Sequence, residues 1–146
     1  MVYFGLKLAD NPALEKVCKK VENFPELEEL LEGMSYLMHL GKANGISATQ
    51  VGDDRQVILL ASGEAYVNPR IISQRGIQLN VEECMSLPKK KYLRLRPAVV
   101  TIEYQDRQGA SHQKKFYWGQ AAILKHEMDH LNGKQVSKIG LFGGLK

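Results

Sequence analysis

The chain has 146 residues and a formal net charge of +4, with 44% hydrophobic and 25% charged residues. This length fits a single domain over residues 1–146, and the balanced composition excludes a disordered or fibrous protein. No stretch approaches the roughly 20 apolar residues that cross a membrane, and the first residues lack the basic start of a signal peptide, so we expect a cytoplasmic protein without membrane contact.

Two N-terminal helices are predicted. Asn11-Pro12 is typical of a helix start, and apolar residues follow at positions 14, 17, 18 and 21. A second amphipathic helix is predicted between Pro25 and Gly41, because its apolar residues recur with the period of a helix. These residues are Leu27, Leu30, Leu31, Met34, Leu37 and Met38. Cys18 lies on the apolar stripe of the first helix, where its expected role is packing.

After Gly45 the pattern changes to that of strands. Short apolar or alternating runs predict strands at 56–60, 66–67, 71–72, 77–81, 99–104 and 113–117. Asn68-Pro69 is interpreted as a breaker between two strands, and 106–109 (Asp-Arg-Gln-Gly) as a hairpin turn.

The last predicted element is a helix from about Gly119 to Leu131, ended by Asn132-Gly133. Helices, then strands, then a helix indicate an α+β domain, with antiparallel or mixed strands around this final helix.

The strongest chemical signal is His126-Glu127-Met128-Asp129-His130. Histidines four residues apart lie on one helix face, so both imidazoles can bind one divalent ion. Glu127 lies between them, where its carboxylate can take a proton from a water that the ion acidifies. Because a catalytic tetrahedral site has three protein ligands and one open position, a third ligand is needed.

Three residues are candidates for the third ligand. His39, on the second helix, and His112, in a hairpin turn, are typical of surface residues. Cys84 is the remaining soft candidate; a lone cysteine is usually a small core residue, but the polar neighbours of Cys84 in Glu-Glu-Cys-Met-Ser over 82–86 make core packing less expected here. The chain has two cysteines, too few for a disulfide framework. One thiolate and two imidazoles suit iron(II), zinc, cobalt and nickel about equally.

Three segments resemble, in order and spacing, the signature motifs of peptide deformylases. The family's first motif, Gly-x-Gly-Leu-Ala-Ala-x-Gln, is similar to residues 43–50, Ala-Asn-Gly-Ile-Ser-Ala-Thr-Gln. The second, Glu-Gly-Cys-Leu-Ser, is similar to residues 82–86, and the third, His-Glu-x-Asp-His-Leu, matches 126–131 in full. One such motif is weak, but the three together are a strong signal, and the resemblance spans nearly the whole chain.

The resemblance implies a hydrolase that removes the formyl group from the N-terminal methionine of newly made polypeptides. Metal-bound water or hydroxide would attack the formyl carbon, with Glu127 as general acid and base. Cys84, His126 and His130 would bind one divalent ion. This ion is most often Fe²⁺ in similar enzymes, and Zn²⁺, Ni²⁺ or Co²⁺ can substitute.

The resemblance also implies roles at the substrate. The amide of Gln50 and the backbone N–H of Met85 would stabilise the oxyanion, and the peptide would lie beside residues 79–83. Residues expected at the substrate are Gly45, Ile46, Glu82, Arg96, Ala122 and Ile123. Core packing is the alternative for Ala122 and Ile123, and a place on the basic surface is the alternative for Arg96.

Two departures from the family pattern stand out. Glu83 replaces a motif glycine. It would be strained if the backbone there has positive φ, and otherwise it adds a carboxylate at the rim of the site; we expect activity to survive with altered peptide preference. Residues 141–146 show no helical period. The long C-terminal helix with which many bacterial members dock on the ribosome is therefore expected to be missing, as in a short phage or organellar form.

The charge distribution offers another ribosomal contact. Residues 1–73 hold 7 basic and 10 acidic residues, and residues 74–146 hold 13 and 6. The basic residues of the second half include Lys89, Lys90, Lys91, Arg94, Arg96, Lys114 and Lys115. Such a surface can bind an anionic partner such as RNA, here the ribosome, and an ordinary solvated surface is the alternative.

Two other functions stay open at this point. A small metallopeptidase also uses His-Glu-x-x-His, although Cys84 and Gln50 are not typical of one. A non-catalytic metal-binding or ribosome-binding relative needs the ligands but not Glu127. The expected partners are formyl-methionyl nascent peptides, and the simplest assembly is a monomer.

Overall fold

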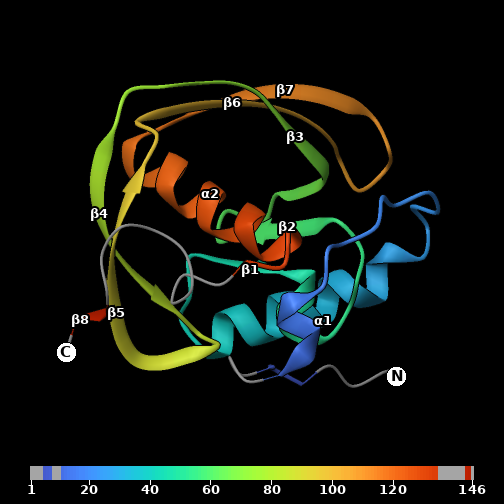
Figure 1. The fold of residues 1–146 in the computed structure, drawn as a ribbon. Helices are drawn as coiled ribbons and strands as arrows, with labels where there is room; N and C mark the ends of the chain where they lie inside the picture. Colours follow the sequence, from blue (N-terminus) through green and yellow to red (C-terminus); the bar gives the residue numbers. More distant parts are fainter. Residues whose placement is uncertain (1–4, 8–10, 135–143, 146) are drawn as a thin grey trace.

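The computed structural model describes residues 5–7, 11–134 and 144–145, which form an α+β fold of helices and antiparallel strands (Figure 1). The elements are η1 Pro12–Glu15, α1 Leu27–Leu40, β1 Gly45–Ser47, η2 Ala48–Val51, β2 Val57–Leu60, β3 Ala65–Arg75, β4 Gln78–Cys84, β5 Leu87–Arg96, β6 Val99–Gln105, β7 Ser111–Tyr117, α2 Trp118–Leu131 and β8 Gly144–Leu145. This architecture confirms the predicted fold class.

The strands form two antiparallel sheets around the last helix. One sheet has the order β1-β2-β3-β6-β7, and the other has the order β4-β5-β8. In Figure 1, α2 lies in the middle of the molecule, with β6 and β7 above it, β1 below it and β4 and β5 along one side. The central position expected for the final helix is therefore confirmed.

Strand β2 is buried on both faces because a helix covers each of them. Val57 and Leu59 pack with the apolar stripe of α1, whereas Ile58 and Leu60 pack with side chains of α2. This explains why its sequence is a continuous apolar run without alternation. The neighbouring β1 leads directly into η2, so the first motif lies between the two helices.

The helix expected after Asn11 is reduced to a single 3₁₀ turn. Asn11 caps that turn through Ala13 N, as predicted, but the chain is extended from Lys16 onward. Cys18 N donates to Leu131 O at 2.8 Å and pairs the segment with the end of α2. Val17 is 68% exposed while Cys18 is buried, an alternation typical of extended chain. The apolar spacing fitted a helix, but pairing with α2 determined the conformation.

The predicted helix between Pro25 and Gly41 is confirmed as α1. All six residues of its apolar stripe are buried, and Gly41 follows the helix as its C-cap. The two histidines judged to be surface residues are also exposed, since His39 lies near the end of α1 and His112 pairs with Asp106 in the β6-β7 hairpin.

Asn68-Pro69 does not separate two strands, because β3 continues through it. The backbone of Asn68 has φ 51°, and the pairing with β6 shifts register between Val67 and Arg70. The Asn68 side chain accepts from Val21 N and donates to Val21 O, at 2.7 and 3.0 Å. A bulge held by these side-chain bonds accommodates the proline without ending the strand.

The sequence pattern did not reveal β5. On this strand the usual order of burial is inverted: Arg94 and Arg96 are buried, and Leu95 is 46% exposed. The short β1 and β8 were not predicted either. The expected lack of a C-terminal helix falls mostly on residues 135–143 and 146, which lie outside the described residues. The described pair Gly144–Leu145 forms a short strand that pairs with β5.

No helix in the described part of the chain is both long and apolar enough to cross a membrane. Cys18 and Cys84 are free thiols and are both buried.

Candidate metal centre

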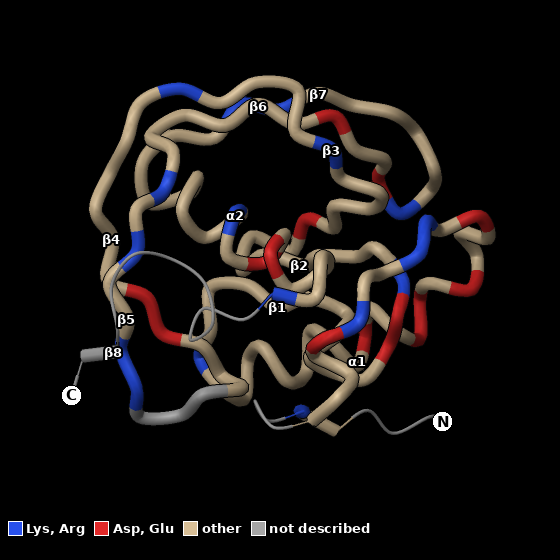
Figure 2. Tube along the Cα trace, viewed as in Figure 1, with Lys and Arg blue, Asp and Glu red and all other residues tan. Residues whose placement is uncertain are grey.

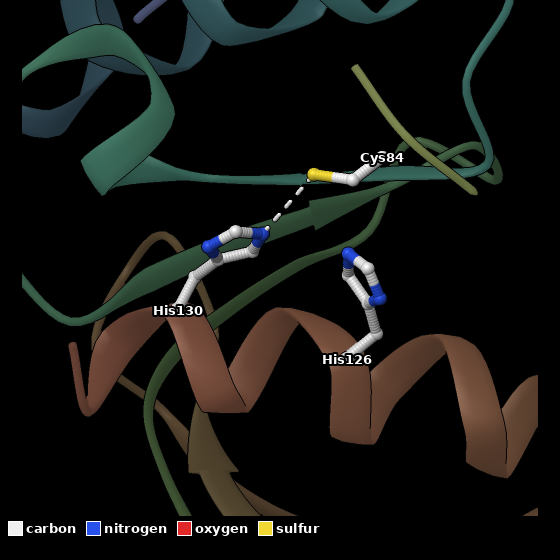
Figure 3. A group of neighbouring side chains, drawn as sticks. All are labelled: Cys84, His126 and His130. Atoms are coloured by element: carbon white, nitrogen blue, oxygen red, sulfur yellow. Dashed lines mark hydrogen bonds between the residues drawn. The ribbon is translucent and has the colours of Figure 1, made fainter. Parts of the chain in front are cut away.

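Two histidines of α2 and a cysteine from the end of β4 point toward one another (Figure 3). His126 and His130 are one helical turn apart and share a face of α2. The donor atoms of Cys84, His126 and His130 all lie within 4.8 Å of one another, and Cys84 Sγ is 3.4 Å from His130 Nε2. All three side chains are buried, as in a site built for an ion rather than a surface cluster.

The protonation preferences of the histidines fit a cation at this place. Burial, together with the charges of His126 and Arg96, lowers the pKa of His130 to about 3, so its imidazole is neutral as a metal ligand must be. Burial opposes charge on His126 too, but the Cys84 thiol and the Glu82 carboxylate raise the pKa of His126 to about 10. The thiol and the carboxylate thus favour positive charge at His126, as a divalent ion bound at this place would also provide.

Glu82 and Arg96 support His126 from behind. Glu82 Oε1 is 2.9 Å from His126 Nδ1, which leaves Nε2 for an ion. Arg96 donates to both Glu82 oxygens at 2.6 and 2.7 Å and also to Asp129. Burial alone would raise the pKa of Glu82, but hydrogen bonds from Arg96 and His126 lower it to about 2, so this carboxylate stays ionised.

Glu127 is a buried carboxyl beside the ligands. Burial is the main reason that its pKa is raised to about 7. Its Oε1 atom has no hydrogen-bond partner among the described residues. A Cβ at position 45 would lie 3.3 Å from Glu127 Oε2 and 2.9 Å from Leu60 Cδ2, so Gly45 allows this close packing. A carboxyl that is balanced between its two protonation states near neutral pH suits proton transfer.

Gln50 lies on the other side of the ligands, on η2. Its Oε1 accepts from Ser47 N at 3.1 Å, in a capping box that fixes the side chain. Its Nε2 therefore faces the cysteine loop, 3.6 Å from Cys84 Sγ and 3.2 Å from Ser86 Oγ. A buried amide donor is thus held next to the ligands.

These groups open onto one pocket of about 580 Å³ between α1, α2, β1 and β4. Most of the predicted site residues line it: Gly45, Gln50, Glu82, Cys84, Met85, Ala122, Ile123, His126 and Glu127. His130 lies behind them, fully buried. Residues from four separate parts of the chain are therefore brought together as the motifs indicated.

Two residues expected at the substrate lie elsewhere. The Ile46 side chain is fully buried in the core with α1 and does not line the pocket. Arg96 neither lines the pocket nor lies on the surface, because its guanidinium is buried between Glu82 and Asp129. Glu82 reaches the pocket, but both of its oxygens are used by Arg96 and His126.

Other pocket residues were not singled out from the sequence. They include Leu6, Leu37, Leu40, Gly41 and Asn44. Leu37 belongs to the regular apolar stripe of α1 and Leu40 lies outside that stripe, so nothing in the pattern marked either leucine as a wall of the pocket.

The chain matches known proteins over nearly its whole length. A family profile described as polypeptide deformylase matches residues 6–139. A peptide deformylase of Alkaliphilus metalliredigens is 36% identical over 132 residues, which cover 88% of this chain and 90% of that protein.

Solved structures agree with the sequence match. The peptide deformylase of Thermotoga maritima superposes with a TM-score of 0.89 at 26% identity, covering 93% of this chain and 96% of that one. A Met-Ala-Ser-bound class I type b peptide deformylase of Acinetobacter baumannii superposes with a TM-score of 0.87 at 25% identity, covering 94% of this chain and 99% of that one.

Proposed function

Because this chain belongs to the polypeptide deformylase family, we propose a role for each residue of its site in the family's reaction. The chain is a metal-dependent hydrolase that removes the formyl group from the N-terminal methionine of new polypeptides and releases formate. The peptidase and non-catalytic alternatives are not favoured. The observation that carries the assignment is the Cys84, His126 and His130 cluster, with Glu127 in the same pocket.

Cys84, His126 and His130 are proposed as the protein ligands of the divalent ion. Their mutual distances and the negative charge of the thiolate and of nearby Glu82 fit a buried cation. We propose Fe²⁺ as the native ion, and Zn²⁺, Ni²⁺ and Co²⁺ suit the same donors. When bound, the ion polarises the formyl carbonyl and acidifies water.

Glu127 is proposed to move the proton. It takes the proton of the attacking water, and it then gives that proton to the departing amine of methionine. Its raised pKa supports both steps, because the carboxyl accepts and releases a proton near neutral pH. Burial keeps bulk water from competing for this proton.

Gln50 Nε2 and the backbone N–H of Met85 are proposed as donors to the oxyanion that develops on the formyl oxygen. Gln50 is held in place through Ser47 before substrate arrives, so its reorientation costs little in the transition state. Met85 follows Cys84 directly and lines the same pocket.

The substrate is proposed to lie extended along β4. Among the described residues, β4 pairs only with β5, so its other edge can bond to a peptide backbone. Gly45 faces it from β1, and Ala122 and Ile123 form apolar walls for the methionine side chain. Glu82 and Arg96 contribute by positioning His126 rather than by touching the substrate.

Glu83→Gly is expected to change kcat/KM for formyl-methionyl peptides by less than about tenfold. The Glu83 backbone is unstrained, since positive φ outside glycine occurs only at Lys42, Asn68 and Trp118 in the described residues. Its carboxylate is exposed, 3.7 Å from Lys91. Peptides with lysine and with glutamate after methionine, compared in both proteins, measure the change in preference. A gain of several orders of magnitude would contradict this.

A ribosome contact is proposed for the exposed lysines Lys90, Lys91 and Lys115. Figure 2 shows the basic residues of β5 in a row along one side of the molecule. Arg94 and Arg96, grouped with them from the sequence, are buried and unavailable. A monomer in the cytoplasm, where nascent chains are made, fits this proposal. Co-sedimentation with ribosomes that weakens with salt is expected; salt-independent or absent binding would contradict it.

The test of the function is formate release from formyl-methionyl-alanyl-serine. The protein is purified without oxygen, because a thiolate ligand is readily oxidised, and loaded with Fe²⁺ or Ni²⁺. Formate is expected, and no cleavage of the unformylated peptide. Cleavage of the peptide bond instead would support a peptidase, and a folded, metal-loaded protein that is inert to both would contradict catalysis.

A further inference from the structure

Gly41, the C-cap of α1, lies against the side chain of Met85. A Cβ at position 41 would overlap Met85 Sδ and would lie 3.3 Å from Met85 Cγ, closer than normal non-bonded separations. The Gly41 backbone has φ −84° and ψ −2°, which any L residue adopts. A larger residue at position 41 is therefore opposed by the present position of the thioether and not by the backbone, and it would force the thioether to move.

Both residues also line the pocket. The Met85 side chain is partly buried and packs against the core cluster that contains Leu37, a residue that itself reaches the pocket. Close packing leaves no room for the thioether within that cluster. Methionine has three rotatable side-chain bonds, so a thioether forced away from Gly41 would move into the open space beside it, which is the pocket.

We propose that Gly41 is a specificity-determining residue. The space left by its missing Cβ seats the Met85 thioether against the end of α1 and keeps that side chain out of the cavity that receives the substrate's N-terminal side chain. This inference rests on the proposed function of the pocket, because it assigns a size limit to that cavity.

Gly41→Ala is expected to raise KM for formyl-methionyl-alanyl-serine about tenfold, with kcat changed by less than about threefold. For formyl-alanyl-alanyl-serine, whose first side chain is shorter, KM is expected to rise much less. Calorimetric binding of the product Met-Ala-Ser to the Zn²⁺-loaded protein is expected to weaken by the same factor as KM rises. Binding does not depend on turnover, so it reports the pocket separately from catalysis.

Rescue distinguishes a steric effect through Met85 from general damage. In a Met85→Ala background the shortened side chain no longer reaches position 41, so Gly41→Ala is expected to leave KM and product affinity where Met85→Ala alone puts them. Gly119→Ala is the matched control. It also adds a methyl group to a glycine at a helix end, but nothing lies within 4 Å of the added Cβ. Thermal melting of each variant checks its folding.

Each result decides the proposal. Unchanged KM and product affinity in Gly41→Ala would overturn it, as would an equal loss with and without Met85→Ala. If the parent protein releases no formate, the proposed function fails, and the product-binding comparison still decides the role of Gly41 by itself.

Discussion

Glu127→Gln is expected to lower kcat for formate release by about a thousandfold, in the range found when a general acid or base is removed. The amide has nearly the shape of the carboxyl, so the close packing of this side chain against Gly45 is kept. It cannot take a proton from water or deliver one to the amine. The measurement is the initial rate of formate release at saturating peptide.

Metal content and product affinity separate loss of the base from loss of the site. Glu127 is not one of the three clustered donors, so the variant is expected to bind one ion and to bind Met-Ala-Ser as the parent does. Glu32→Gln removes an exposed carboxylate of α1 and serves as the control with unchanged rate. A Glu127→Gln protein that retains more than about a tenth of the parent rate would exclude Glu127 as the proton carrier.

The elements that could be predicted from the sequence are those in which the buried residues recur with the regular spacing of a helix or a strand. The stripe of α1 faces a single neighbour, the β1-β2 region, so burial and helical spacing coincide. The same holds for the pair His126 and His130, since four residues along a helix place two side chains on one face wherever the helix packs. Both predictions depend only on local geometry.

Strand β5 could not be predicted, because partners distant in sequence determine what is buried on it. The inner face of the β4-β5 pair carries Arg94 and Arg96, and Leu95 points outward. Buried arginines are stable here because Glu82 and Asp129 lie on neighbouring elements. A pattern of hydrophobic and polar residues contains no information about which carboxylates will be nearby, so the basic run looked like surface.

For the same reason, the roles of Glu82 and Arg96 could not be predicted from the sequence. Both residues were expected at the substrate, but nothing in the sequence distinguishes an acidic residue that touches the substrate from one that bonds to a ligand histidine. Only the pairing of β4 with β5, beside α2, brings His126, Glu82, Arg96 and Asp129 into one chain of contacts. The motif at 82–86 therefore contains both a proposed metal ligand, Cys84, and the residue that supports another ligand, Glu82.

Removal of the Arg96 guanidinium from this series of contacts is expected to have the largest effect on stability. Arg96→Met keeps an unbranched apolar stem, but it leaves the buried Glu82 carboxylate with His126 as its remaining charged partner and breaks the ion pair of the partly buried Asp129 carboxylate. We expect the free energy of unfolding to fall by about 3–5 kcal/mol, measured by urea denaturation of the metal-free protein. Arg70→Met breaks the exposed pair with Glu103 and is expected to cost less than about 1 kcal/mol.

The pH dependence of the stability difference between the parent and Arg96→Met shows whether lost charge pairing or lost packing destabilises the variant. In the parent, Arg96 and His126 hold the pKa of Glu82 at about 2, below its ordinary 4.5, so this stabilisation is complete above about pH 5 and is lost as pH falls toward 2. Without Arg96, only His126 opposes the effect of burial, so the pKa of Glu82 rises and mild acid neutralises the carboxylate more readily. The stability difference between parent and Arg96→Met is therefore expected to shrink from pH 7 to pH 3. A difference that is constant over this range would mean that lost packing, and not the unpaired charge, destabilises the variant.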